Sequence, residues 1–441
     1  MMTWPHLLSS QRLSRADALS SKGRSSFQQD LDRIVFCSAF RRLQNKTQVH
    51  PLTHNDNIRT RLSHSVEVAS VGRSLGTIVG STIAPRLKLE GITADSFGHI
   101  VQAACLAHDI GNPPFGHAGE DAIKDWFATT SAGQSIVKGM KSAERHDFEN
   151  FDGNAQGFRI LTQLEQRKWS GGLQLTHAAL GAFTKYPRAS TAPAQKSYPG
   201  SKKVGIYQSE LEYFIAIADS LKLQPQGKSG AAWSRHPLAY LMEAADDICY
   251  SIIDIEDGAA LGHLSYQEAE NILLPIARIS KRDLLGSAGE KLSHLRAKAI
   301  GNLVNSVAEA FLNEEKSLLA GSFAAELIDK TPYAENVALA KQTAHEQIFI
   351  SREKTVRELA GASVITGLLD MLTEVPVALA ASKFDASRLK GRTAKLARLT
   401  GLDGPQPKNL YHATLRITDY VAGMTDRFAT DLYRNLRGLA M

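Results

Sequence analysis

The sequence predicts an all-α protein, because its apolar residues follow a helical repeat and no run of alternating strands is present. Apolar residues recur at intervals of three and four along 64–80, 97–110, 236–262 and 411–436, as they do in helices with one buried face. No internal repeat of solenoid length is visible. We therefore expect helices throughout, with room for at most a short hairpin.

Composition is that of an ordinary globular protein. The chain has 441 residues, of which 43% are hydrophobic and 22% charged, enough for one large helical domain or two smaller ones. The N-terminus lacks an apolar run of secretory length, and the most apolar later stretch, 363–381, is interrupted by Asp370 and Glu374. These features predict a soluble, cytoplasmic protein.

The cysteines and the net charge limit the kinds of function that the sequence allows. Cys37, Cys105 and Cys249 stand singly among apolar neighbours, so we expect reduced core residues rather than a zinc knuckle or a redox pair. A net charge of +6 and an isoelectric point near 9.0 favour polyanionic partners. A nucleoside triphosphate and a nucleic acid both satisfy that charge.

Two stretches are predicted to leave the helical body. Residues 185–205 are rich in Pro, Ser and Lys and read as a loop. Residues 382–409 form a basic segment whose default interpretation is a solvated face. Its cations between residues 383 and 398 are Lys383, Arg388, Lys390, Arg392, Lys395 and Arg398.

Two histidines and two aspartates provide ligands for a divalent cation. His64, His108, Asp109 and Asp246 offer neutral nitrogen and anionic oxygen donors from separate segments, which suits a metal site with a position left for water. Adjacent side chains on a helix point about 100° apart. His108 and Asp109 can therefore share an ion only where their helix ends, and the Gly and Pro residues at 111–114 predict that end.

Several motifs resemble the bacterial HD-domain deoxyguanosine triphosphatase family, a group of deoxynucleoside triphosphate triphosphohydrolases. The resemblance covers most of the chain and keeps the order of the motifs. The matching stretches are FRRLQNKTQV (40–49), RTRLSHSVEVA (59–69), AHDIGNPPFGHAGE (107–120), FDGNAQGFRIL (151–161), KYP (185–187), LMEAADDICYSIIDIEDG (241–258) and DYVAGMTDRFA (419–429).

The resemblance implies an HD-domain helical bundle with additional C-terminal helices. We expect an N-terminal helical segment at 1–58, the metallophosphohydrolase core at 59–260, and a C-terminal helical region at 261–441 that completes the fold and carries oligomer contacts. It also implies that His64, His108, Asp109 and Asp246 are the metal ligands.

Helical spacing separates Asp246 from its neighbour Asp247. Asp246, Tyr250 and Asp254 lie at i, i+4 and i+8 and share one helix face, whereas Asp247 points elsewhere. In the family the residues matching Tyr250 and Asp254 touch the nucleotide sugar. We expect Asp247 to be an exposed or capping acid.

The remaining site residues follow from the matching motifs. His117 and Glu120 are three apart on a helix expected to start near Pro113 or Pro114, and the resemblance implies that His117 transfers a proton while Glu120 orients it. Arg61 lies three residues before His64 and is a candidate for binding phosphate. Further contacts implied by the resemblance are Gln44 near the nucleoside, and Lys185, Tyr186 and Lys203 near the triphosphate.

The predicted reaction is metal-dependent hydrolysis of dGTP or other dNTPs to deoxynucleoside and tripolyphosphate. The donor set suits Mn²⁺, with Mg²⁺ able to support turnover and Co²⁺, Ni²⁺ or Fe²⁺ as alternatives. The rival interpretations are an HD phosphohydrolase of nucleoside monophosphates or phosphodiesters, and a nucleic-acid-binding regulatory HD protein. The resemblance further implies a homo-oligomer, with single-stranded DNA as a regulator.

Overall fold

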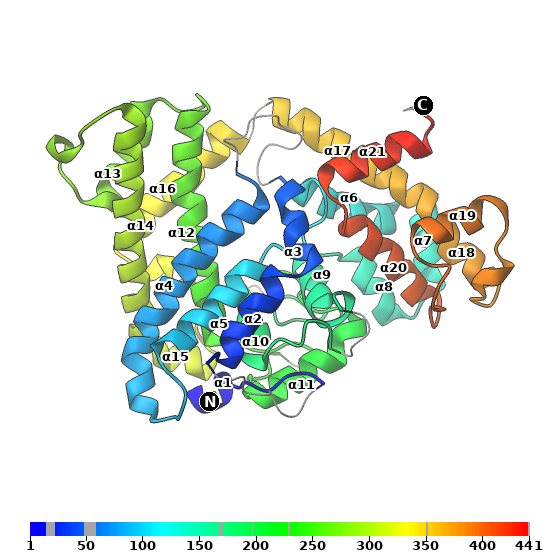
Figure 1. Ribbon diagram of the computed structural model, residues 1–441, viewed down its shortest axis with the longest axis horizontal. Coiled ribbons are helices and arrows are strands. Elements are labelled where there is room, and N and C mark those ends of the chain that lie inside the picture. Colours follow the sequence, from blue (N-terminus) through cyan, green and yellow to red (C-terminus); the bar gives the residue numbers. More distant parts are fainter. Residues whose placement is uncertain are drawn as a thin grey trace.

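The computed structural model describes residues 1–14, 23–47, 59–166, 171–195, 197–227, 230–349 and 352–439. The described residues form helices and no strand (Figure 1), which confirms the all-α prediction. The first helices are α1 (Trp4–Leu7), α2 (Ser26–Val35), α3 (Ser38–Arg42), α4 (Arg61–Leu87), α5 (Ala94–Ala107), α6 (Gly116–Thr129), α7 (Ser131–Lys138), α8 (Ser142–Glu149), α9 (Gly153–Arg159), α10 (His177–Phe183) and α11 (Leu211–Leu221). The others are α12 (Pro237–Ala260), α13 (Tyr266–Ala277), α14 (Ala288–Asn313), α15 (Glu315–Ala320), α16 (Ala334–Ala344), α17 (Arg352–Leu372), α18 (Glu374–Ala381), α19 (Gly391–Leu399), α20 (Leu410–Ala422) and α21 (Asp426–Leu436).

The described residues contain isolated β-bridges but not the short hairpin that the sequence analysis allowed. In the predicted loop 185–205 and the segment after it, Arg188 pairs with Ala232 and Ala189 with Ile206. Single bridges do not make strands. Among the described residues of this loop the only helical element is a 3₁₀ turn, Pro199–Ser201, so its irregular character is confirmed.

Close packing of α4 against α5 sets the centre of the fold. Gly72, Gly76 and Gly80 recur every four residues on α4, facing α5. A Cβ on Gly76 would lie 2.7 Å from the carbonyl oxygen of Phe97, and one on Gly80 would lie 2.8 Å from that of Ala94. Only glycine permits helices to approach this closely. The contact holds the start of α4 near the end of α5.

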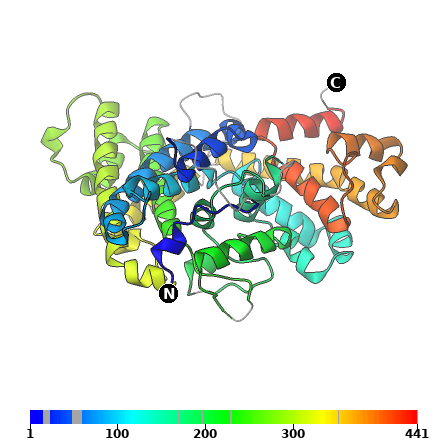
Figure 2. The ribbon, with the colours of Figure 1, turned by 60° about the horizontal axis from the view of Figure 1, so that its bottom comes forward.

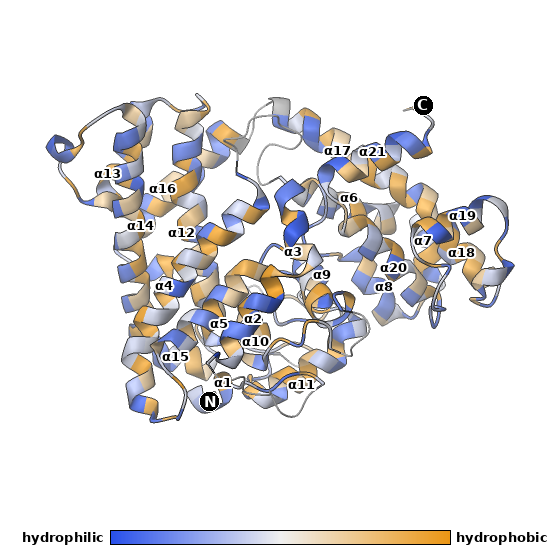
Figure 3. Cartoon of the chain, viewed as in Figure 1, coloured by the Kyte–Doolittle hydropathy of each residue, from blue (hydrophilic) through white to orange (hydrophobic). Residues whose placement is uncertain are grey.

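Two apolar cores divide the helices between them. The first gathers α2, α4, α5, α10, α12, α13, α14 and α16, and the second gathers α6–α8 with α17–α21. In Figures 1 and 2 these groups occupy opposite ends of an elongated molecule. Figure 3 shows polar and apolar residues alternating along outer helices such as α14 and α21, as expected for helices with one buried face.

Two helix boundaries differ from the sequence predictions. The predicted helix over 411–436 is two helices, because α20 ends at Ala422 and Thr425 caps a new helix. The helix expected from Pro113 or Pro114 begins at Gly116 instead. Phe115 and Gly116 both have left-handed backbone, with φ of 63° and 60°, which no α-helix continues through.

One stretch is long and apolar enough to cross a membrane by length and composition alone. It spans Lys354–Ala381, and half of its most apolar window is buried inside the protein. Thr373 separates α17 from α18 within it. Core helices of soluble proteins meet the same test, so the stretch is weak evidence for a membrane span.

His236 caps α12 as a neutral imidazole and should make stability depend on pH. Its Nδ1 accepts the Leu238 N–H at 3.1 Å, and its Nε2–H donates to the Leu7 carbonyl at 2.9 Å. Burial lowers the pKa of His236 to about 4, against about 6.5 in an unfolded chain. Its contribution to folding is therefore complete above pH 6.5 and is lost as the pH falls through 4.

The matched variant is His236→Asn, which keeps a capping acceptor but does not titrate. We expect the free energy of unfolding of the wild type to fall more steeply than that of the variant between pH 6.5 and 4. The difference should reach on the order of 3 kcal/mol. Denaturant titrations at several pH values measure it, and parallel curves for the two proteins would contradict it.

Candidate metal centre and active site

Three helices bring the predicted ligands together. His64 lies in the first turn of α4, which Thr60 and Ser63 cap reciprocally; His108 ends α5, and Asp246 lies midway along α12. Ligand atoms of His64, His108 and Asp109 lie within 4.8 Å of one another. Asp246 Oδ1 is 3.0 Å from His64 Nε2 and 3.6 Å from His108 Nε2. The end of α5 before Asp109 also agrees with the expected helix end.

The tautomer of His108 argues for a cation among these atoms. Its Nδ1 lies 2.6 Å from the Cys105 carbonyl oxygen, which only accepts, so Nδ1 carries a proton. In the neutral ring, Nε2 then presents a lone pair to carboxylate oxygens of Asp109 and Asp246, 3.7 and 3.6 Å away. Electron-rich atoms converge in this way where a metal ion sits among them. Two imidazoles and two carboxylates fit such an ion.

Charges around the cluster keep both aspartates ionised. Burial alone would raise the pKa of Asp109, but Arg61 and the two histidines lower it to about 2. Burial likewise opposes ionisation of Asp246. The effects of His108 and His64, which apply when these rings are protonated and no cation is bound, outweigh it, so the pKa of Asp246 lies well below the usual range. Metal ligands must be deprotonated, so both carboxylates are ready to bind at neutral pH.

Asp109 is held from both of its oxygens. Arg61 Nη1 donates to Oδ2 at 2.6 Å, and the Asn112 side-chain amide donates to Oδ1. The Nε of Arg61 is buried without a hydrogen-bond partner among the described residues. Arg61 therefore orients a proposed ligand, and its predicted phosphate contact stays a prediction.

The two residues of the predicted proton-transfer pair, His117 and Glu120, differ in their exposure to solvent. His117 is exposed, whereas Glu120 is only 6% exposed. Glu120 Oε2 accepts the Gly153 N–H at 2.9 Å, and Oε1 lies 3.5 Å from Lys203 Nζ. Within the described part of the chain, no hydrogen bond joins Glu120 to His117. The charge of Glu120 opposes the effects of burial and of Lys203, which lower the pKa of His117.

A buried ion cluster holds Lys185 toward the metal centre. Lys185 Nζ lies 3.3 Å from Glu243 Oε1, and Glu243 also receives two hydrogen bonds from the guanidinium of Arg235. Arg235 Nε donates to the Lys185 carbonyl at 2.7 Å. Glu243 lies one helical turn before Asp246 on α12. Tyr186 is buried beneath both cations.

The predicted nucleoside contacts lie on two elements. Tyr250 and Asp254 follow Asp246 on α12, Tyr250 half-buried and Asp254 8% exposed. Asp254 Oδ2 has no hydrogen-bond partner in the described residues, and burial raises the pKa of this carboxyl to about 7. Gln44 is exposed in the 3₁₀ turn Leu43–Asn45. Its contact with a nucleoside stays a prediction.

Other predicted features lie away from the centre. Asp247 is paired with Lys341 on α16 at 2.7 Å rather than capping a helix. The three cysteines are buried and free, as expected. In the basic segment, Arg388 and Arg392 pair with Asp385 and Glu374. The six cations between residues 383 and 398 are exposed, as on a solvated face.

Sequence reasoning missed several residues that support the site. Asn112, Glu243 and Asp426 contact ligands, predicted substrate residues or the segments that carry them, and they lie inside motifs already matched to the family. Lys46, within the first matched motif, is 3% exposed. Their presence in the matching motifs was the available signal. Their hydrogen-bond partners lie in distant segments, so residue spacing could not predict them.

Comparison with known proteins defines the class and then the family. Residues 61–223 match the model of the HD domain, so the chain is a hydrolase of the HD class. It is 44% identical to a deoxyguanosinetriphosphate triphosphohydrolase-like protein of Pseudomonas aeruginosa (strain LESB58) across 99% of both chains. It is 43% identical to a protein of that description from Synechocystis sp. across the whole of both, and 32% identical to the deoxyguanosinetriphosphate triphosphohydrolase of Serratia proteamaculans across 93% of both. The chain belongs to this deoxyguanosinetriphosphate triphosphohydrolase-like family.

Proposed function

We propose that this enzyme hydrolyses deoxynucleoside triphosphates, dGTP among them, to deoxynucleoside and tripolyphosphate. One observation carries the proposal: Asp246, which faces the two histidines, and Asp254, whose buried Oδ2 has no hydrogen-bond partner among the described residues, lie along one face of α12. A metal site beside an acceptor for a sugar hydroxyl suits a nucleotide better than a simple phosphate ester. The names of the relatives support the same substrate class.

The proposed ligands are His64, His108, Asp109 and Asp246. A divalent ion held by them would polarise a phosphoryl oxygen and lower the pKa of water. His117 stands at the exposed side of the site, where it can move a proton, while Glu120 and Lys203 form its charged surroundings.

Cations around the cluster suit the triphosphate. Lys185 is oriented by Glu243, and Lys203 by Glu120, so both ammonium groups are placed without being fully neutralised by a single close contact. We propose that they and Arg61 hold the β and γ phosphates in place. Water then attacks the α-phosphorus and the bond from that phosphorus to the 5′-oxygen breaks. The 5′-oxygen takes up a proton and leaves as the deoxynucleoside, while the water oxygen stays in the tripolyphosphate.

An assay with separated products tests the function. Wild type is incubated with each of the four dNTPs and with GTP, in Mn²⁺ and in Mg²⁺, and deoxynucleoside, tripolyphosphate and orthophosphate are resolved by chromatography. We expect deoxynucleoside and tripolyphosphate, both absent with His108→Ala. Orthophosphate as the first product would refute attack at the α-phosphorus, and turnover of monophosphates or diesters alone would replace the proposed substrate class.

Tyr250 provides a prediction on sugar discrimination. Its ring on the Asp246 face of α12 is proposed to exclude a ribose 2′-hydroxyl. Tyr250→Ala should lower the ratio of kcat/KM for dGTP over GTP by about tenfold or more, whereas Tyr250→Phe, which keeps the ring, should preserve it. An unchanged ratio in the Ala variant would remove Tyr250 from this role.

Two further proposals concern the assembly of the enzyme and its regulation. A homo-oligomer and regulation by single-stranded DNA stay predictions, for which the exposed cations of residues 383–398 offer a surface. A change in hydrolysis rate on adding an oligonucleotide, reversed by salt, is the expected sign of such binding.

A further inference from the structure

Asp426, the first residue of α21, joins two segments far from it in sequence. It is 2% exposed. Its Oδ1 accepts the N–H of Phe115 at 3.0 Å, and its Oδ2 accepts the N–H and the hydroxyl of Thr47 at 3.0 and 2.8 Å. Three donors therefore converge on one buried carboxylate, and one of them belongs to Phe115, the N-cap of α6.

The backbone at Phe115 is unfavourable without such a bond. Phe115 and Gly116 are consecutive left-handed residues, and this conformation costs a residue with a Cβ about 1–2 kcal/mol. Phe115 is the N-cap of α6 but makes no side-chain cap. A buried hydrogen bond to a charged group contributes about 1.5–3 kcal/mol, enough to offset the left-handed turn.

The same turn lies against the metal centre. A Cβ on Gly116 would come within 2.9 Å of Arg61 Nη2, the guanidinium that binds Asp109 through its other terminal nitrogen. His117 follows directly, and Glu120 lies one turn further along α6. The path of the chain through Phe115 and Gly116 therefore sets where the proposed proton-transfer pair stands relative to the ligands.

Lys46 adds a second link between the same two regions. Its buried Nζ donates to the carbonyl of Asn112 at 2.5 Å and to that of Ala422 at 2.8 Å. Asn112 in turn donates to Asp109. Through Lys46 and Asp426, the segment 422–426 is thus linked to both ends of the stretch 112–115, which joins Asp109 to α6.

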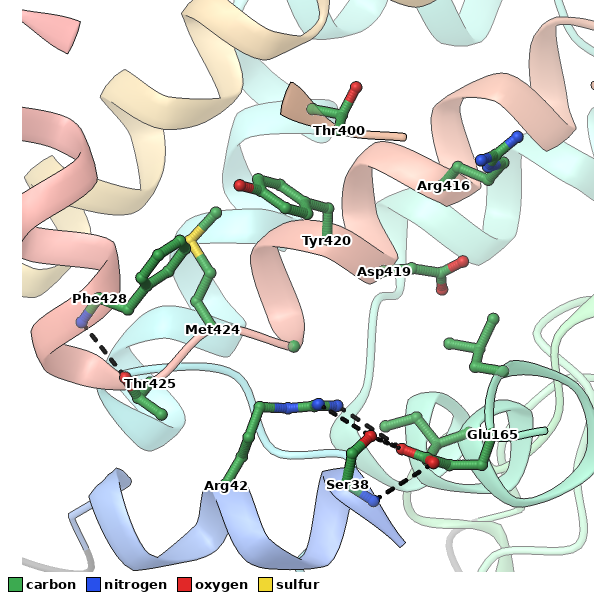
Figure 4. Close-up of a pocket in the computed structure, with 13 residues that line it drawn as sticks. Ser38, Arg42, Glu165, Thr400, Arg416, Asp419, Tyr420, Met424, Thr425 and Phe428 are labelled. Carbon is green, nitrogen blue, oxygen red and sulfur yellow. Dashed lines mark hydrogen bonds and ion pairs between the residues drawn. The ribbon is translucent and has the colours of Figure 1, made fainter. Parts of the chain in front are cut away.

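The outer side of this segment borders a cavity of about 540 Å³. Met424, Thr425 and Phe428 line this cavity together with Arg42, which extends beside Thr425 in Figure 4. Side-chain packing is therefore incomplete on that side. The position of segment 422–426 therefore depends more on the hydrogen bonds of its inner side, above all those of Asp426.

We infer that Asp426 is a positioning residue, which fixes the left-handed turn at Phe115 and thereby the placement of His117 and Glu120 beside the metal centre. This inference rests on the proposed function for its catalytic consequence. Its structural consequence, an ordered turn at 113–117, can be measured without any assay of activity.

The test compares Asp426→Asn with Thr47→Val. Asparagine keeps the shape but has one acceptor oxygen, so it cannot serve both the Phe115 and the Thr47 amides. Thr47→Val removes only the hydroxyl donor and leaves the Phe115 bond intact. We expect Asp426→Asn to lower kcat on the order of 10²-fold, as a misplacement of about 1 Å does, with KM and metal affinity nearly unchanged. Thr47→Val should stay close to wild type.

Hydrogen–deuterium exchange of peptides covering 110–120 provides the second readout. Faster exchange there in Asp426→Asn but not in Thr47→Val supports the inference, even if wild type turns over no dNTP and the proposed function fails. A folded Asp426→Asn protein with wild-type kcat and wild-type exchange would overturn it. So would parallel losses of kcat, metal affinity and thermal stability, because these mark a general structural role.

Discussion

Asp246→Asn is expected to lower kcat/KM on the order of 10³-fold and to weaken metal binding. Asp246 supplies the only carboxylate of the proposed centre that comes from α12, and its Oδ1 faces both histidine Nε2 atoms at 3.0 and 3.6 Å. A neutral amide oxygen is a weaker ligand than a carboxylate, and a metal ion contributes several kcal/mol to such reactions, each 1.4 kcal/mol being tenfold in rate. Steady-state kinetics and Mn²⁺ titration measure the two effects.

Asp247→Asn is the matched control, since it makes the same chemical change one residue away. Asp247 pairs with Lys341 on α16 at 2.7 Å, and as the next residue on the helix it points about 100° away from Asp246. Its loss should cost no more than about 1 kcal/mol of stability and leave metal affinity as in wild type. Equal effects of the two substitutions would show that the helix-face argument assigned the wrong aspartate.

The second large effect concerns folding. Arg159 joins the segment before α11 to α20 through buried ion pairs, donating to Glu210 at 2.6 Å and to both oxygens of Asp419 at 2.8 Å. Arg159→Met fills similar space but leaves two buried carboxylates without their cation. We expect the free energy of unfolding to fall by about 3–5 kcal/mol, the usual result of breaking a buried pair. Chemical denaturation measures it.

Arg145→Met provides the comparison on the surface. Arg145 pairs with Glu149 one turn along α8, with 48% of its side chain exposed. Such pairs contribute about 0.3–0.5 kcal/mol, so this variant should unfold almost as wild type does. A loss for Arg159→Met no larger than that for Arg145→Met would mean that Glu210 and Asp419 take up protons or find other partners.

Sequence patterns predicted much of this protein for definite physical reasons. Helical periodicity reports which residues turn inward, so the all-α class and the central parts of α4, α5 and α12 follow from it. The Gly and Pro residues after Asp109 predicted the end of α5, and with it the convergence of His108 and Asp109. Spacing along α12 separated Asp246 from Asp247 because helical geometry is local.

Tertiary structure decided which distant groups meet. The late start of α6 and the left-handed Phe115 escaped prediction, because the carboxylate that accepts the Phe115 N–H is more than three hundred residues away from it in sequence. Arg61 proved to bind Asp109, and Glu120 to bind the Gly153 amide. The sequence by itself determined the helices, the inward faces and the ligand types. Only packing decided the hydrogen-bond partners. These depend on close contacts between segments, and the separation of two segments along the chain does not tell how far apart they lie in space.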